Sequence, residues 1–102
     1  MTTHKWYFVV TDDYRKQLAN LSRKDRRLVF KRMREILISD NPKVVSGVRR
    51  LVSVEPPQYR LRQGVYRLIF AVDTDPITVQ KHDYQGTVEF LAVLHRKDAY
   101  RP

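Results

Sequence analysis

The pattern of apolar and polar positions is most regular between residues 59 and 70, where tyrosine, leucine and phenylalanine alternate with arginine. Alternation with a period of two predicts two half-buried strands, and Gln63-Gly64 predicts the turn that joins them. With a loop of two or four residues, we expect Leu61 opposite Tyr66 and Arg60 opposite Arg67. The expected core face carries Tyr59, Leu61, Tyr66, Leu68 and Phe70, and the other face carries Arg60, Arg62 and Arg67.

Two helices are predicted before this hairpin. Thr11 and Ser22 can cap them, because a hydroxyl oxygen accepts a hydrogen bond from a backbone N–H of the first turn. Asn41-Pro42 ends the second helix, and the short connection predicts an antiparallel helical hairpin. The apolar stripes are Tyr14, Leu18 and Leu21 in the first helix, and Leu28, Val29, Met33, Ile36 and Leu37 in the second.

The rest of the chain predicts strands and connections. Residues 6–10 are aromatic and β-branched, which favours a first strand. The continuous apolar run at 90–94 predicts a last strand that is covered on both faces. The other expectations are a loop or helical turn at 43–50, a short extended piece at 51–54, a hairpin ending near 72–73, a turn at 73–76, a short strand or hairpin arm at 77–86, and a last strand over 87–94.

The predicted order is therefore strand, helix, helix and then three strands. This order favours an α+β fold: a mostly antiparallel sheet of about four strands, with the N-terminal helical hairpin packed on its apolar face. The arginine face would lie on the opposite side. A length of 102 residues predicts a single domain over residues 1–102.

The chain is strongly basic. Lys and Arg total 20 against 11 acids, which gives a formal net charge of +9. Such a surface suits nucleic acid or an acidic protein partner, although charge alone also fits a basic surface without a specific role.

Several classes of site and location are disfavoured. The chain has no cysteine, which excludes disulfides, thiol catalysis and cysteine-based zinc sites. Its three histidines are scattered without metal-ligand spacing, and no cofactor is implied. No apolar run suits a signal peptide or a membrane span, so we expect a cytoplasmic protein without membrane contact.

The arginine face is the strongest chemical signal. Guanidinium groups bind phosphate bidentately and stay charged in any site. During cleavage of an RNA phosphodiester, the 2′-hydroxyl is the nucleophile, and fixed arginines can stabilise the negative charge that grows on the phosphoryl oxygens. The alternative is an exposed strand face with solvated charges.

A second group of candidates follows the last strand. His95 can act as an acid or base near neutral pH. Tyr100 can stack on a base or transfer a proton once nearby cations lower its pKa. Both residues can instead simply pack against the edge of the sheet.

The second helix carries many basic residues. They form a solvated face, a surface that follows nucleic acid, or a docking surface for an acidic partner, and the sequence leaves these three interpretations open. These residues are Arg23, Lys24, Arg26, Arg27, Lys31, Arg32 and Arg34.

The segments 59–62, 65–70 and 93–101 together resemble the RelE/ParE toxin superfamily of toxin–antitoxin modules. The resemblance covers nearly the whole chain and is closest to RelE members. It implies a metal-independent endoribonuclease that cuts mRNA on the ribosome and is neutralised by an acidic antitoxin. The implied site residues are Arg60 and Arg62, where RelE has lysines, together with Arg67, Arg96 and Tyr100.

The resemblance leaves the proton-transfer group and the biological target open. Arginine is a poorer proton donor or base than lysine, so His95 is the further candidate for this step. Tyr100 follows Arg96 more closely than the corresponding tyrosine does in RelE. Two other functions remain: inhibition of DNA gyrase by binding, as in the ParE branch, and nucleic-acid binding without catalysis.

Overall fold

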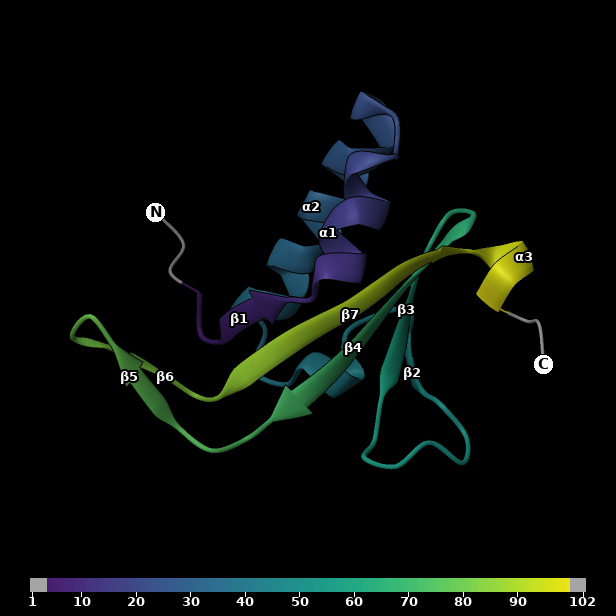
Figure 1. Ribbon diagram of the computed structural model, residues 1–102. Coiled ribbons are helices and arrows are strands. Elements are labelled where there is room, and N and C mark those ends of the chain that lie inside the picture. Colours follow the sequence, from purple (N-terminus) through teal and green to yellow (C-terminus); the bar gives the residue numbers. More distant parts are fainter. Residues whose placement is uncertain (1–3, 100–102) are drawn as a thin grey trace.

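The computed structural model describes residues 4–99, with two main helices packed on one face of a sheet and a short helix at its far end (Figure 1). In chain order the elements are β1 (Tyr7–Val10), α1 (Asp12–Ala19), α2 (Arg23–Ile38), the 3₁₀ turn η1 (Pro42–Val44), β2 (Val48–Arg50), β3 (Tyr59–Gln63), β4 (Tyr66–Asp73), β5 (Ile77–Val79), β6 (His82–Tyr84), β7 (Thr87–His95) and α3 (Arg96–Ala99).

The main sheet has five strands in the order β1-β7-β4-β3-β2. Strand β1 runs parallel to β7, and the other neighbouring pairs are antiparallel. The predicted α+β fold is confirmed, with two refinements: the sheet is mixed and it has a fifth strand. That strand, β2, lies at residues 48–50, whereas the sequence predicted an extended piece at 51–54. With Arg49 and Arg50 beside a single valine, it lacks the apolar alternation that marks a strand.

Both helices begin at the predicted caps. The Thr11 hydroxyl accepts a hydrogen bond from the backbone N–H of Tyr14 (3.0 Å), and the Ser22 hydroxyl accepts one from Asp25 (3.1 Å). Helix α2 ends at Ile38, before the Asn41-Pro42 pair as predicted. Within the described part of the chain, no helix combines the length and the hydrophobicity that a membrane crossing requires.

The core lies between the helices and the sheet. Helix α1 contacts β7, and α2 contacts β3. Rings from α1, β4 and β7 meet at the centre: Phe90 lies 5.4 Å from Tyr14 and 6.1 Å from Phe70 between ring centroids. The buried apolar residues are Trp6, Tyr14, Val29, Met33, Ile36, Leu37, Tyr59, Leu61, Leu68, Phe70, Val88, Phe90 and Val93.

The β3–β4 hairpin has the predicted faces but not the predicted register. Arg62 pairs with Arg67, and Leu61 pairs with Leu68, so the predicted pairings were wrong by two residues. The cause is the position of the two-residue loop, which is formed by Gly64 and Val65 and not by the predicted Gln63-Gly64 pair; Gly64 adopts a φ of +57° in it. Because side chains alternate with a period of two, this shift leaves every side chain on its predicted face.

A β-bulge interrupts β7. Phe70 pairs with Phe90 and Ile69 pairs with Ala92, so Leu91 is the extra residue. The Leu91 carbonyl accepts a hydrogen bond from the Thr11 hydroxyl at 2.7 Å. The prediction that residues 90–94 are covered on both faces holds only for the helix side, because the residues facing away from the helices are half-buried.

Residues 77–84 form the predicted hairpin arm. Strands β5 and β6 pair with each other as a separate two-stranded sheet and extend away from the main sheet (Figure 1). Gln80 and Lys81 both have positive φ, as a two-residue turn between strands of matching twist requires. The ring of Tyr84 lies 5.4 Å from that of Tyr7, so the base of the arm contacts β1.

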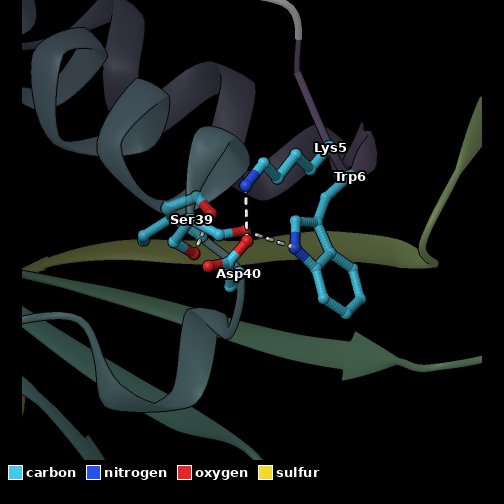
Figure 2. Close-up of polar contacts among 5 residues, drawn as sticks. Lys5, Trp6, Ser39 and Asp40 are labelled. Atoms are coloured by element: carbon cyan, nitrogen blue, oxygen red, sulfur yellow. Dashed lines mark hydrogen bonds and ion pairs between the residues drawn. The ribbon is translucent and has the colours of Figure 1, made fainter.

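The start of β1 is tied to the end of α2. Figure 2 shows Trp6 and Lys5 pointing toward the segment that follows this helix. The Trp6 indole N–H donates to the Ser39 carbonyl (2.9 Å), and Lys5 forms an ion pair with Asp40. The hydrogen bond and the charge of Lys5 lower the pKa of Asp40. Because both charged groups are solvated, the buried indole is the stronger part of this connection.

Candidate functional site

An open groove lies on the face of the sheet that the helices do not cover. Its floor is apolar and comes from β4 and β7, through Ile69, Ala92 and Leu94. Residues 44–52 form one wall, and Arg60 and Arg62 of β3 lie between this wall and the floor. The volume of the groove is about 1330 Å³.

The arginines are arranged in two rows across the strands. Arg49 of β2 pairs with Arg60 of β3, and this row continues to Ile69. In the next row, Arg62 pairs with Arg67 of β4. Both rows concentrate positive charge, and like charges directly opposite each other destabilise a sheet. An anion bound in the groove would reduce this repulsion.

Arg67 differs from the other arginines of this face because its side chain is buried. The residue is 4% exposed, and its Nη1 donates to the carbonyls of Gly64 (2.9 Å) and Tyr66 (2.8 Å). The guanidinium therefore holds the β3–β4 turn. Arg62 is exposed on the adjacent strand, so the two opposed arginines have different environments.

The wall of the groove is held from the helix side. Arg32 of α2 forms an ion pair with Glu35 and donates from Nη2 to the Ser46 carbonyl at 2.5 Å. Next to it, Gly47 has a φ of +89°, and its carbonyl accepts a hydrogen bond from the Arg62 backbone N–H at 3.1 Å. This chain of contacts connects α2 to the strand that carries the groove arginines.

His95 lies on the helix side of the sheet, away from the groove. It pairs with Tyr66, and the two rings meet edge to face with centroids 5.9 Å apart. The Tyr66 hydroxyl donates to Asp25 (3.1 Å), and partial burial together with this bond raises the pKa of Tyr66. His95 Nδ1 accepts a hydrogen bond from the Lys97 backbone N–H at 3.2 Å. The structure therefore separates His95 from Arg60 and Arg62.

The C-terminal candidates lie beyond the end of β7. Arg96 is exposed at the start of α3, and its backbone N–H donates to the Val65 carbonyl at 2.6 Å. This bond places Arg96 beside the β3–β4 turn, at the same end of the sheet as Arg62 and Arg67. Tyr100 lies outside the described residues.

Arg49 and Arg50 also line the groove, and the sequence analysis identified neither of them. Without a predicted strand at residues 48–50, the face of the sheet that each side chain occupies could not be assigned. Gly47 offers a local signal, since a glycine before a short Val-Arg-Arg segment is compatible with a turn into an edge strand. The pairing of Arg49 with Arg60 extends the basic surface to the edge of the sheet.

The groove combines features that suit an anionic, flexible and partly apolar ligand. Exposed guanidinium groups can bind phosphate oxygens bidentately, and the aliphatic floor offers a surface on which the face of a nucleobase could rest. In residues 4–99, no three His, Asp or Glu side chains group together as metal ligands would. The arrangement can bind a phosphodiester and stabilise negative charge on it.

Comparisons with known proteins give the fold a name. No family model and no curated protein match the sequence, but solved structures match the fold. A chain of the archaeal RelE-RelB complex from Pyrococcus horikoshii OT3 has a TM-score of 0.67 and 21% identity, with 90% of this chain and 96% of that chain covered. A chain of the RelB-RelE antitoxin-toxin complex from Methanococcus jannaschii has a TM-score of 0.64 and 20% identity, with 90% of this chain and 94% of that chain covered.

A third structure agrees with these two. It is the toxin-antitoxin complex RelBE2 from Mycobacterium tuberculosis, with a TM-score of 0.61, 22% identity, and 90% of this chain and 99% of that chain covered. The alignments extend over nearly the whole of each chain, so the likeness is not confined to one motif. The protein therefore has the fold of the RelE-type toxins.

Proposed function

We propose that this protein is the toxin of a type II toxin–antitoxin pair and that it cleaves mRNA on the ribosome. The observation that carries the proposal is the arginine-lined groove on the open face of a RelE-type fold. The three similar structures are toxin–antitoxin complexes. We accordingly propose an acidic antitoxin as the partner, which the net charge of +9 would attract.

In the proposed reaction, the RNA 2′-hydroxyl loses its proton to a base and attacks the adjacent phosphorus. The bond from phosphorus to the 5′-oxygen of the next nucleotide breaks, and that oxygen takes up a proton, which leaves a 2′,3′-cyclic phosphate and a 5′-hydroxyl. Arg60 and Arg62 would bind the non-bridging oxygens, where charge accumulates in the transition state. Because RNA supplies its own nucleophile, this chemistry has no requirement for a metal ion. The exposed Arg96, beside the β3–β4 turn, would bind a neighbouring phosphate.

Arg67 would have a different role from the arginines that line the groove. Its two hydrogen bonds to backbone carbonyls support a positioning role, in which it fixes the turn between the strands that carry Arg62 and Ile69. The charge of Arg67 would add to the potential of the groove without direct contact with the phosphate.

Proton transfer needs a group other than arginine. We propose Tyr100 for this step and a packing role for His95, because the imidazole lies against Tyr66 on the helix side. Cations around a phenol lower its pKa and so favour its use as a base.

The proposal is tested by inducing the chain in growing cells and mapping mRNA 5′ ends. Cuts in phase with codons on translated messages are expected, and Arg62→Ala should abolish them. Intact mRNA together with DNA breaks and stalled replication would overturn the proposal in favour of gyrase inhibition. Survival of the cells, with RNA binding retained in vitro, would instead indicate a binding protein without catalysis.

A further inference from the structure

A second basic surface lies on α2, on the opposite side of the molecule from the groove. Helix α2 packs against the sheet through Val29, Met33 and Ile36, so its solvent-facing side points away from the groove. This side carries five exposed cations, Arg23, Lys24, Arg27, Lys31 and Arg34.

The five cations lie along one side of the helix. Successive residues are about 100° apart around an α-helix, so these five fall within an arc of about 100°. Four of them follow one another at intervals of four, four and three residues, which spaces their Cα atoms by about 4.5–6 Å along the axis. This spacing is comparable to the distance between successive phosphates along a nucleic-acid strand. The four are Arg23, Arg27, Lys31 and Arg34.

No acid in the described residues neutralises this row. The two acids of α2 have other partners: Asp25 accepts a hydrogen bond from Tyr66, and Glu35 is paired with Arg32. The described ion pairs use other cations, namely Lys5, Arg15, Arg32 and Arg50. A shallow hollow of about 510 Å³ is lined by Arg23, Lys24, Arg27 and Leu28, so three cations surround one space.

The apolar residues of this side favour nucleic acid over a partner helix. Phe30 is 52% exposed and Leu28 is 38% exposed, but they lie on opposite margins of the cation row, about 160° apart around the helix. A docking helix needs a continuous apolar seam with anchors one turn apart. Here the seam is interrupted by charge, whereas a regular polyanion needs only the charged row.

We propose that the outer side of α2 binds the phosphate backbone of a double-helical RNA, separately from the RNA strand in the groove. The sheet and the core lie between the two surfaces, so one short strand cannot occupy both. The cation row would therefore hold the toxin on a structured RNA while the groove receives a flexible one. This inference concerns binding alone and does not depend on the cleavage proposed above.

The test measures binding of a fluorescent RNA hairpin to the full chain by anisotropy at several salt concentrations. The variant Arg23→Gln/Arg27→Gln/Lys31→Gln/Arg34→Gln removes the row. The charge-matched control Arg15→Gln/Lys16→Gln/Lys43→Gln/Lys81→Gln removes four exposed cations elsewhere. Glutamine keeps helix propensity close to that of arginine and lysine, and thermal melts verify folding of both proteins.

We expect the row variant to bind at least about ten-fold more weakly near 0.1 M salt, and the slope of log K against log salt to fall by about 3 to 4. The control should keep most of its affinity and slope. Equal losses in both variants would show that net charge alone binds RNA, which overturns the proposal. Unchanged hairpin binding by the row variant would also overturn the proposal. The same holds if the row variant binds the hairpin normally and loses only the binding of an acidic peptide in the same assay. Arg62→Ala should retain hairpin binding, which separates this result from the role of the groove.

Discussion

Arg62 and Arg67 lie directly opposite each other on β3 and β4, yet one is exposed and the other is 4% exposed. Their shared position on the groove face does not give them a shared role. Arg67 donates to two backbone carbonyls at the β3–β4 turn, whereas Arg62 is available to a ligand. The difference leads to opposite expectations for the two alanine variants.

We predict that Arg67→Ala lowers the free energy of unfolding by about 2 kcal/mol, because it removes charge-assisted hydrogen bonds that hold a turn. Arg62→Ala should change it by less than about 0.5 kcal/mol, as is usual for an exposed side chain, while abolishing activity. Urea denaturation measures both. Arg34→Ala is the matched control, since it removes an exposed arginine outside the groove. Equal stability of Arg67→Ala and Arg62→Ala would contradict the positioning role of Arg67.

The strand faces at this candidate site were predicted from the sequence, and the features that were not predicted have identifiable physical causes. The faces of β3 and β4 were correct although their register was wrong, because a shift of two residues preserves side-chain direction. Strand β2 was missed because Arg49 and Arg50 hide the strand pattern at the sheet edge.

The position of His95 depended on a feature that the sequence does not reveal. Without the bulge at Leu91, strict alternation from the buried Phe90 would place His95 on the groove face. The extra residue reverses the alternation, so that Leu94 lines the groove and His95 contacts Tyr66. The bulge is supported by contacts from α1 and its N-cap: the Thr11 hydroxyl donates to the Leu91 carbonyl, and the Gln17 side chain accepts a hydrogen bond from the Val93 N–H at 2.7 Å.

This reversal leads to a prediction for proton transfer. Tyr100→Phe should lower the cleavage rate by at least about 100-fold, which is the usual contribution of a general acid or base. His95→Gln should leave the pH dependence of the rate unchanged and lower the rate by a small factor. Single-turnover cleavage on programmed ribosomes across a range of pH measures both. A changed pH profile in His95→Gln alone would place the proton on the imidazole instead.

The core contains a tyrosine whose hydroxyl has no hydrogen-bond partner among the described residues. Tyr14 is fully buried, and burial raises its pKa well above the ordinary value. We predict that Tyr14→Phe raises the free energy of unfolding by about 1 kcal/mol, because an unsatisfied buried hydroxyl is removed. Chemical denaturation at neutral pH measures the change, and a loss of stability would reveal a partner for the hydroxyl.

The raised pKa of Tyr14 predicts that the protein loses stability at alkaline pH. Its pKa is higher in the folded protein than in the unfolded chain, so the unfolded chain releases the proton first. The stability linked to Tyr14 is therefore present below about pH 10 and decreases as the pH rises above that value. Tyr14→Phe should flatten this decrease in a pH series of melts. If the stability of the variant and of the parent decreased equally with rising alkaline pH, the decrease would belong to other titrating groups.

Two glycines provide a paired test of the packing between β1 and the sheet. A Cβ on Gly86 would lie 2.1 Å from the Asp73 carbonyl oxygen and 2.6 Å from the Trp6 ring, whereas a Cβ on Gly64 would meet no atom within 4 Å. We predict that Gly86→Ala costs at least about 3 kcal/mol. Gly64→Ala should cost only the positive-φ penalty of about 1–2 kcal/mol. Similar costs in thermal melts would contradict the close approach at Gly86.

The central claim is that the arginine groove cleaves mRNA on ribosomes. The most direct measurement is 5′-end mapping of one defined message on purified ribosomes, with the parent chain, Arg60→Ala/Arg62→Ala and Arg15→Ala compared at equal concentration. Arg15 is an exposed arginine of α1, outside both the groove and the cation row. We expect codon-phased cuts with the parent and with Arg15→Ala, and none with the groove variant, whose melting temperature should be unchanged. Uncut message with the parent chain, or equal cutting by the folded groove variant, would contradict the account.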